Sequence, residues 1–173
     1  MQLNEALVAK IAQIAIFRGM PRQCLINTLN CADSWPIKQG DTFFHEGDRG
    51  QSFFILLAGE VSVTKRSGAT EVTLATLKPG QCFGEMALVD GKPRSATVKA
   101  NQNCISLRFS REKLEGYPEA STFVYRNIAK VLVQRLAESN DTNVRLAAQV
   151  ATMGGEKALA EPAAPPKRVV VSK

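Results

Sequence analysis

The sequence predicts a mainly β domain, a barrel or sandwich of short strands with helices on both sides. Short apolar and alternating runs fill the stretch from Trp35 to about Phe109, and turn signals separate them. Helical periodicity marks the segments before and after this stretch. Several short strands at near-regular spacing are typical of an all-β barrel or sandwich. The length of 173 residues fits one such domain with short extensions.

Helices are expected in the first 32 residues. Apolar residues recur there at spacings of three and four, the pattern of one helix face: Leu3, Leu7, Ile11 and Ile14. Gly19 and Pro21 interrupt this pattern, and a second short helix is predicted around Arg22–Cys31. Residues 1–32 are therefore expected to form an N-terminal helical segment.

Residues 33–112 are expected to form the β-barrel. The continuous apolar run at 53–57 suits a strand buried on both sides. Apolar and polar residues alternate at 61–64, 72–74 and 105–107, as they do in half-buried strands. Turn signals separate these runs: Gly40-Asp41, Gly47-Asp48, Ala58-Gly59, Ser67-Gly68, Pro79-Gly80 and Asp90-Gly91.

Helical texture returns at Ser110, which is a suitable N-cap for a short helix. Gly116 and Pro118 end that helix, and residues 119–150 are predicted to form a long one with a break near Asp141. Residues 113–150 are thus expected to form a C-terminal helical region. Residues 151–173 are rich in Ala and Pro and are predicted to be a disordered tail.

Charge and hydropathy narrow the function classes. The formal net charge of +6 favours anionic partners, but without a dense basic stripe it does not predict DNA binding. Glu5 and Lys10 interrupt the first apolar stretch, so no secretory signal is expected. No apolar run reaches the ~18 residues that cross a bilayer. We therefore expect a cytoplasmic protein without a membrane span.

Metal and acid–base chemistry are not expected. The four cysteines form no CxxC pair, so we expect reduced thiols packed as small apolar residues, with iron–sulfur ligation as the alternative. His45 is the single histidine and lies at a predicted turn. No pair of groups suited to acid–base catalysis accompanies it, so no enzyme activity is predicted.

The segment from Phe83 to Val98 carries the strongest chemical signal. Gly84 allows a backbone conformation or a close approach that a side chain would block. The next four residues are good helix formers, and Asp90-Gly91 limits them to about one turn. The N–H groups at the start of such a helix suit a phosphate. Arg94 is placed to fold back to the same phosphate with charge-assisted hydrogen bonds.

Each of these residues has an ordinary alternative when it is taken singly. Gly84 alone is a turn, and Glu85 alone is a solvated carboxylate at a helix start. Arg94 alone is a surface cation, and Ser95 alone is a strand residue. The functional interpretation depends on the complete ordered string, in which repulsion keeps Glu85 from the phosphate and suits it to a sugar hydroxyl.

That string, Phe-Gly-Glu through Pro-Arg-Ser-Ala-Thr-Val, resembles the phosphate-binding cassette of the cyclic nucleotide-binding domain family. The family includes catabolite-activator-type transcription factors and regulatory subunits of cAMP-dependent protein kinase. Residues 44–63 resemble the first half of its barrel, and the flanking helices match as well. The resemblance covers about residues 10 to 145. It implies a double-stranded β-helix, or jelly-roll barrel, with N-terminal helices and a long C-terminal helix.

The resemblance also implies roles for individual residues. The family's Glu at Glu85 accepts a hydrogen bond from the ribose 2′-hydroxyl, and its Arg at Arg94 pairs with the cyclic phosphate. The hydroxyl of Ser95 matches bacterial activator-type sensors, which favours cAMP and leaves cGMP open. The remaining positions implied by the family form the phosphate cradle or pack against the nucleotide: Gly84, Met86, Ala87, Val63 and Leu74. Simple core packing is the alternative for the last two.

The long helix is expected to report on the ligand. Its second half has a coiled-coil seam at spacings of three and four: Leu132, Leu136, Ser139, Asn143, Leu146 and Val150. The family's bacterial members dimerise through this helix, which implies a homodimer. Ser139 and Asn140 fall where activator-type sensors place the polar pair that binds adenine. The alternative is that residues 139–142 cap a helix end.

We therefore predict a regulatory module that binds cAMP, with cGMP as the second candidate, and signals through its C-terminal helix to a dimer or an unidentified protein partner. Activator-type members continue into a DNA-binding domain of roughly 60 residues; here only residues 151–173 follow, so no DNA binding is expected. The alternatives are a domain of the same fold for a dinucleotide or another small anion, and a scaffold without ligand. The single His45 excludes a bis-histidine haem within one chain.

Overall fold

The structure is a computed structural model that describes residues 5–152, apart from the side chains of residues 6 and 7. Two compact units divide the chain, Met1–Val131 and Leu132–Lys173. The helices and strands follow one another as α1 (Glu5–Ala12), η1 (Ala15–Phe17), α2 (Arg22–Asn30), β1 (Ala32–Ile37), β2 (Thr42–Phe44), β3 (Ser52–Ala58), β4 (Val61–Ser67), β5 (Thr70–Leu77), β6 (Cys82–Phe83), α3 (Glu85–Asp90), β7 (Thr97–Ala100), β8 (Cys104–Ser110), α4 (Arg111–Glu115) and α5 (Pro118–Thr152).

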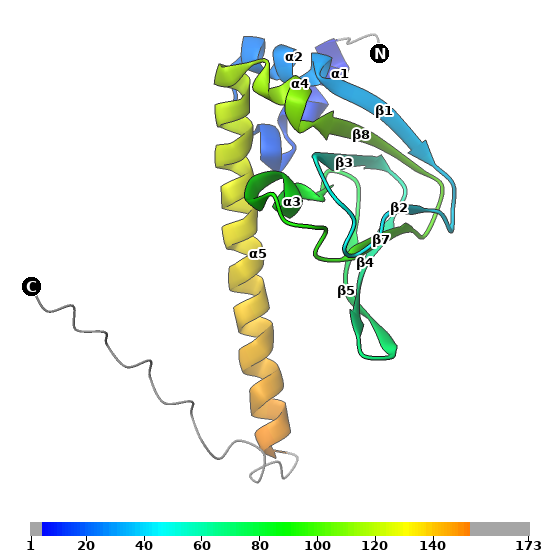
Figure 1. The fold of residues 1–173 in the computed structure, drawn as a ribbon. Helices are drawn as coiled ribbons and strands as arrows, with labels where there is room; N and C mark the ends of the chain where they lie inside the picture. Colours follow the sequence, from blue (N-terminus) through cyan, green and yellow to red (C-terminus); the bar gives the residue numbers. More distant parts are fainter. Residues whose placement is uncertain (1–4, 153–173) are drawn as a thin grey trace, which may run out of the picture. The chain divides into compact units, whose positions relative to one another are not determined.

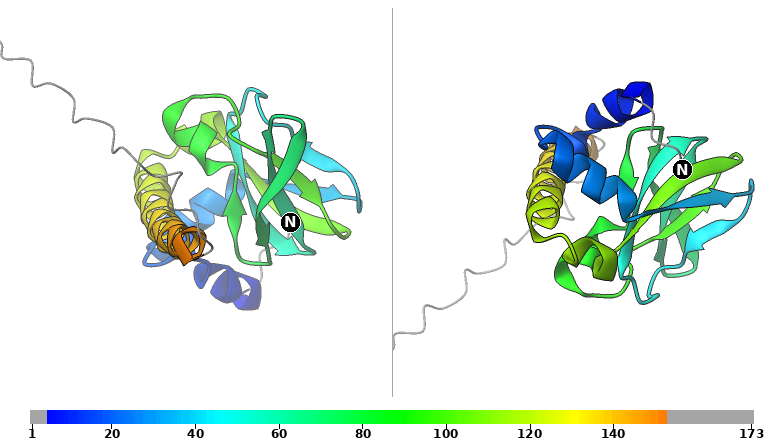
Figure 2. Two further views of the ribbon diagram at one scale, coloured as in Figure 1. Left: turned by 90° about the horizontal axis from the view of Figure 1, so that it is seen from below. Right: turned by 90° about the horizontal axis from the view of Figure 1, so that it is seen from above.

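Eight strands form two antiparallel sheets of four, in the orders β1-β8-β3-β6 and β2-β7-β4-β5. The non-consecutive neighbours arise because the chain crosses between the sheets. Seen along the barrel, the strands surround a common interior (Figure 2). Helices α1, α2 and α4 gather at the end where β1 begins and β8 ends (Figure 1). This confirms the predicted mainly β jelly-roll fold with flanking helices and a long C-terminal helix.

Strand β3 is buried on both faces, as its continuous apolar run predicts, and Ser52 to Leu56 are all buried. It lies between β8 and β6 in the first sheet. On one face, Phe53 stacks on Phe109 with 4.8 Å between ring centroids, and Phe109 meets Phe17 of η1 at 5.9 Å. On the other face, Phe54 stacks on Phe83 at 5.3 Å. The strand therefore joins the barrel core to the N-terminal helices.

The barrel core draws side chains from both sheets. Its buried members are Phe54, Leu56, Val61, Leu77, Phe83, Val98, Ala100 and Cys104. Burial of apolar surface at roughly 25 cal/mol per Å2 is the main force that holds the two sheets together. The four cysteines are buried free thiols, as the sequence analysis expected.

The N-terminal helices pack through part of the predicted apolar face. Ile11 is buried, Leu3 lies outside the described residues, and Ile14 is half-buried. The amide of Asn127 on α5 donates hydrogen bonds to the carbonyl oxygens of Ile16 at 2.9 Å and Arg18 at 3.0 Å. Asn127 thereby satisfies backbone groups that a turn between helices would otherwise leave unpaired.

The C-terminal helices confirm one prediction and correct another. Ser110 caps α4 by accepting a hydrogen bond from the backbone N–H of Lys113. However, α5 runs unbroken to Thr152, so the predicted break near Asp141 and the alternative of a capped helix end at residues 139–142 are wrong. Thr142 donates its hydroxyl proton to the carbonyl oxygen of Glu138, four residues back, which lets a capping-type side chain stay inside the helix.

The sequence also predicts that the chain has no membrane span and that its C-terminal tail is disordered. No helix among residues 5–152 is both long and apolar enough to cross a membrane. The predicted disordered tail lies outside the described residues, apart from residues 151 and 152, which belong to α5.

Candidate functional site

A short helix between two glycines forms one wall of the site. Gly84 follows β6 with φ +78°, and Gly91 ends α3 with φ +68°. Both values lie in the left-handed region, which glycine adopts without the steric cost of a Cβ atom. The chain therefore turns sharply into and out of α3, and the short helix predicted at about one turn is present with six residues.

Arg94 is buried beside this helix, with 5% of its surface exposed. Its backbone is fixed by the turn at 47–48: its N–H donates to the carbonyl oxygen of Asp48 at 2.8 Å, and its carbonyl oxygen accepts from Gly47 at 2.9 Å. These bonds place the side chain between that turn and α3. The alternative of a surface cation is wrong.

The guanidinium of Arg94 has few partners for a buried cation. Its Nη1 donates to the carbonyl oxygen of Gly84 at 2.6 Å, and its Nη2 lies 3.5 Å from the hydroxyl of Ser52. Its Cζ sits 4.0 Å from the centroid of the Phe44 ring. Its Nε is buried and has no hydrogen-bond partner. A buried donor without a partner is costly, so this group is suited to receive an anion.

Two glycines leave the space that the guanidinium occupies. A Cβ atom on Gly50 would lie 2.4 Å from Nε of Arg94 and 2.5 Å from its Cζ. A Cβ atom on Gly84 would lie 2.7 Å from Nη1 and 3.2 Å from the Phe44 ring. The three distances to Arg94 are shorter than non-bonded contact allows, so the guanidinium keeps this position because Gly50 and Gly84 lack side chains.

Charge and burial oppose each other at Arg94. Burial lowers the pKa of its guanidinium, while the carboxylates of Glu85 and Asp48 raise it, and Arg108 lowers it further. Glu85 is itself buried, with 2% exposed, so its alternative as a solvated carboxylate is wrong. The site therefore contains a cation and a carboxylate that are both removed from water.

The other predicted site residues differ in burial. Met86 and Ser95 are exposed, and the Ser95 hydroxyl lies 3.5 Å from the Met86 sulfur. Ala87 is buried in α3. Val63 on β4 is half-buried and packs against the barrel core, as its alternative predicts, whereas Leu74 on β5 is 57% exposed. An apolar side chain this exposed does not belong to the core, so simple packing does not account for Leu74.

The first unit thus brings Gly84, Glu85 and Arg94 together. Ser139 and Asn140 belong to the second unit and are exposed on α5. The sequence analysis missed Phe44, Gly50 and Ser52, which surround the guanidinium. A local pattern does not reveal them, because they lie 42 to 50 positions before Arg94 and meet it only in the folded chain.

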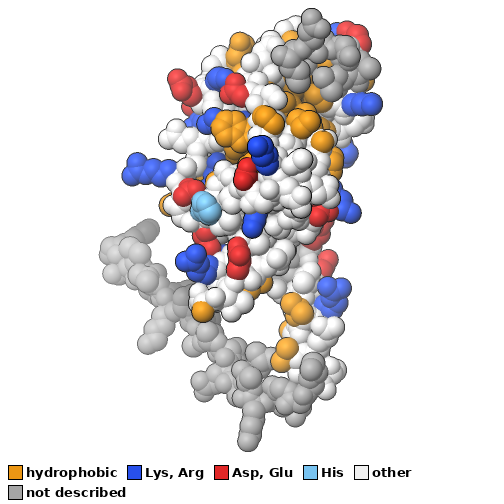
Figure 3. All heavy atoms as spheres, turned by 90° about the vertical axis from the view of Figure 1, so that its right-hand side faces the viewer, with side chains coloured by type: hydrophobic (Ala, Val, Ile, Leu, Met, Phe, Trp, Pro, Cys, Tyr) orange, Lys and Arg blue, Asp and Glu red, His pale blue; other side chains and the backbone are white. Residues whose placement is uncertain are grey.

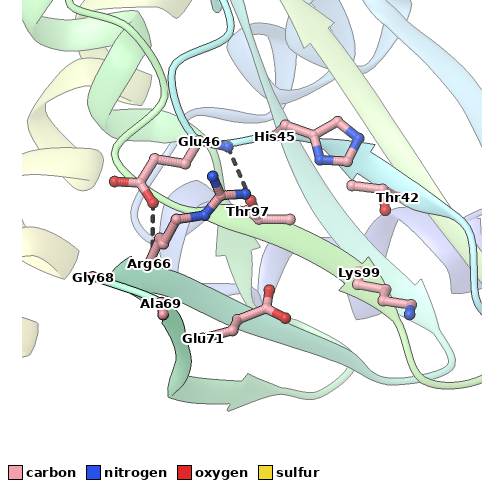
Figure 4. A pocket seen from close by; sticks show the side chains of 9 residues that line it. All are labelled: Thr42, His45, Glu46, Arg66, Gly68, Ala69, Glu71, Thr97 and Lys99. Carbon is pink, nitrogen blue, oxygen red and sulfur yellow. Dashed lines mark hydrogen bonds between the residues drawn. The ribbon is translucent and has the colours of Figure 1, made fainter.

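A separate hollow of about 850 Å3 lies on the second sheet (Figure 4). Thr97 and Lys99 of β7 line it, whereas Val98 and Ala100 between and beyond them point into the core, so the hollow is on the outer face. None of the predicted site residues lines it.

Polar groups within this hollow already bind one another. Glu46 accepts a hydrogen bond from the backbone N–H of Arg66 at 3.0 Å and donates its own N–H to Thr97 at 2.9 Å. Glu71 accepts from the hydroxyl of Thr64 at 2.5 Å. Acidic and basic side chains alternate around His45 on this face (Figure 3). Both signs of charge are mixed on this face, as on an ordinary solvated sheet. The environment of Arg94 differs, because there a single guanidinium is buried.

Metal coordination is not indicated by the described part of the chain, which contains no group of three His, Cys, Asp or Glu side chains placed to hold an ion.

Comparison with known proteins gives a family match. The family model described as the cyclic nucleotide-binding domain matches residues 35–120. The chain is 36% identical over 103 residues to the cyclic AMP receptor protein of Thermus thermophilus, which covers 59% of the chain and 48% of that protein. It is 30% identical over 98 residues to human cGMP-dependent protein kinase 2, which covers 56% of the chain and 13% of the kinase.

A solved structure supports the same fold. The catabolite activator protein of Thermus thermophilus superposes with a TM-score of 0.69 at 30% identity, over 77% of this chain and 63% of that one. The chain therefore spans about half the length of its bacterial relative and about an eighth of the kinase.

Proposed function

Residues 35–120 of the chain belong to the cyclic nucleotide-binding domain family, and on this premise we propose that the chain is a regulatory module that binds a cyclic mononucleotide at Arg94 and α3. One observation carries the proposal: the guanidinium of Arg94 is buried with an unpartnered Nε next to the start of a short helix. A cyclic phosphate there supplies the missing acceptor through charge-assisted hydrogen bonds.

Each group around the phosphate has a distinct part in this proposal. Arg94 neutralises the phosphate, and the backbone N–H groups of Met86, Ala87 and Ser95 donate to its oxygens. Glu85 accepts from the ribose 2′-hydroxyl. Gly84 lets the backbone approach the ligand closely. The apolar side chains of Val63 and Leu74 cover the nucleoside, which gives the exposed Leu74 a partner.

We propose cAMP as the ligand, with cGMP as the second candidate. The bacterial relative is named as a receptor for cyclic AMP, whereas the kinase relative is named for cGMP. Ser95 is exposed next to Met86, so its hydroxyl would be available to a phosphate oxygen or a guanine amino group. The exocyclic groups of the purine therefore decide the preference, and a direct comparison of the two ligands measures it.

The second half of α5 provides the output in this proposal. Its apolar seam residues Leu136, Leu146 and Val150 are exposed in the single chain. A second copy of the chain would cover them as a parallel coiled coil. Ser139 and Asn140 interrupt the seam with hydrogen-bonding groups suited to the adenine, so the ligand would link the cassette to the dimer helix.

The remaining predictions follow from a purely regulatory role. We propose that the module has no enzyme activity, acts in the cytoplasm, and binds no DNA through these 173 residues. In this proposal the barrel at 33–112 would be the sensor and the N-terminal segment at 1–32 its scaffold. The helical region at 113–150 would be the output, and the tail at 151–173 would be a connection. We propose that its protein partner recognises α5 in the position that the helix adopts when the ligand is bound.

A thermal-shift screen tests the ligand class. A ligand that binds only the folded state raises the melting temperature, and at 100 times Kd it adds about 2.7 kcal/mol to the free energy of unfolding. We expect cAMP and cGMP to raise it, and linear 5′-AMP and cyclic dinucleotides to raise it much less. Equal shifts for 5′-AMP and cAMP, or no shift with any cyclic nucleotide, would contradict the proposal.

A further inference from the structure

Arg111 connects the site to the helices that follow the barrel. It is the first residue of α4, and its Nη2 donates a hydrogen bond to the carbonyl oxygen of Leu88 and lies 3.5 Å from that of Ala87. Its backbone N–H donates to the carbonyl oxygen of Gln51 at 2.8 Å. Gln51 precedes Ser52, which contacts Arg94. One residue therefore joins α3, the start of β3 and α4.

Helix α3 needs such a support. Its six residues are too few to be stable by themselves, because helix nucleation costs more than one turn returns. The last carbonyl groups of a helix have no partners within it, and a cation at that end is favourable. No side chain caps the start of α3, where Arg94 instead binds the carbonyl oxygen of Gly84. Two arginines thus hold the two ends of the helix.

We propose that Arg111 is a positioning residue of the ligand site, which holds α3 in place through the carbonyl oxygens of Ala87 and Leu88 without touching the ligand. This inference rests on the proposed function. The groups that α3 presents to the ligand are the carboxylate of Glu85 and backbone N–H groups, and their aim depends on where the helix lies. Loss of Arg111 therefore weakens ligand binding from the far end of the helix.

The same contact links ligand binding to the output end of the first unit. From Arg111 the chain continues through α4 and Gly116 into α5. Tyr125 on α5 shares this environment: burial raises the pKa of its phenol, Glu115 raises it further, and Arg111 opposes both. Its hydroxyl lies 3.4 Å from the Glu115 carboxylate. Because Arg111 belongs to α4 and binds the carbonyl oxygens of α3, a shift of α3 on ligand binding would act on α4 through this contact.

Amide exchange and affinity together test the proposal on the full chain. The variants are Arg111→Met and Arg111→Lys, and Arg126→Met is the matched control, because Arg126 is an exposed arginine that lies over the ring of Phe123, with its Cζ 4.5 Å from the ring centroid. In the ligand-free protein, we expect Arg111→Met to speed exchange of the α3 amides about tenfold, as loss of a charged hydrogen bond implies. Exchange in β3 and β8 should not change. In Arg111→Lys, the exchange rate of the α3 amides should lie between those of the wild type and Arg111→Met.

The cAMP titration gives the second readout. We expect affinity to fall about tenfold in Arg111→Met, for the same reason, and to stay at the wild-type value in Arg126→Met. If Arg111→Met speeds α3 exchange but the wild type binds no cyclic nucleotide, only the proposed function is contradicted. If Arg111→Met leaves α3 exchange unchanged, or if the wild type binds cAMP and Arg111→Met binds it equally well, the role of Arg111 is overturned. If Arg111→Met does not fold, Arg111→Lys decides by the same two measurements.

Discussion

At the scale of single residues, the distinctive feature is a desolvated guanidinium. Arg94 is held by Phe44, Gly84 and Ser52, and these contacts satisfy only part of its five N–H donors. The free energy of folding compensates the cost of burying this cation, so Arg94 is already in position before a ligand binds. A pre-positioned donor loses little conformational entropy on binding. In the proposed function, this pre-positioned cation receives the small anionic phosphate of the ligand.

Gly50 gives a residue-scale prediction. In Gly50→Ala the new methyl group overlaps the Arg94 guanidinium, which is the mobile end of a long side chain and therefore moves rather than the backbone. We expect cAMP affinity to fall about tenfold or more, from loss of at least one charged hydrogen bond. The melting temperature should change little. Calorimetry and thermal unfolding measure the two effects.

Gly116→Ala is the control for this prediction, since Gly116 has φ −63°, which alanine adopts readily, and a Cβ atom there would meet the carbonyl oxygens of Lys113 at 3.3 Å and Glu112 at 3.9 Å but no atom of Arg94. Its affinity should equal that of the wild type. Wild-type affinity in Gly50→Ala would mean that the observed position of Arg94 is not the binding position.

At the scale of elements, local patterns predict those parts of the molecule that local physics determines. Alternation predicts β4, the apolar run predicts β3, and the glycines at both ends predict the length of α3. The break near Asp141 fails because a threonine four residues from a carbonyl can bond within the helix as well as cap it. Local patterns are ambiguous wherever one side chain fits two backbone states.

The candidate site divides in the same way. The contiguous cassette contains Glu85 and Arg94, so its ordered string predicts that they act together, and the structure buries both of them close to each other. Phe44, Gly50 and Arg111 come from separate elements, and their contacts with Arg94 or α3 depend on how β3, β8 and the turn at 47–48 pack. Sequence spacing alone contains no measure of such distances.

The seam on α5 gives an element-scale prediction. Leu136 is 61% exposed on the seam, and Val133 is 67% exposed outside it. In a dimer, Leu136→Lys places a charge in an apolar interface, whereas Val133→Lys places it in water. Sedimentation should show a dimer for the wild type and Val133→Lys, and a monomer for Leu136→Lys. A wild type that is monomeric both with and without cAMP would exclude this output.

At the scale of the whole molecule, the chain combines a barrel of two antiparallel sheets with a long C-terminal helix. The barrel supplies a packed frame of two sheets, and the cassette is a short segment attached to that frame by two arginines. Helix α5 begins in the first unit and continues through the second without a break. We propose that this continuous helix carries the effect of the ligand from the start of α5 to its second half.

The central claim is that the buried guanidinium of Arg94 binds a cyclic phosphate, and calorimetric titration of cAMP into the wild type and Arg94→Met tests it most directly. Methionine fills the apolar slot over Phe44 but donates no hydrogen bond. Loss of a charged hydrogen bond costs ~1.5–3 kcal/mol, so affinity should fall about tenfold to a hundredfold. Equal affinity in the two proteins, with both folded, would contradict the account.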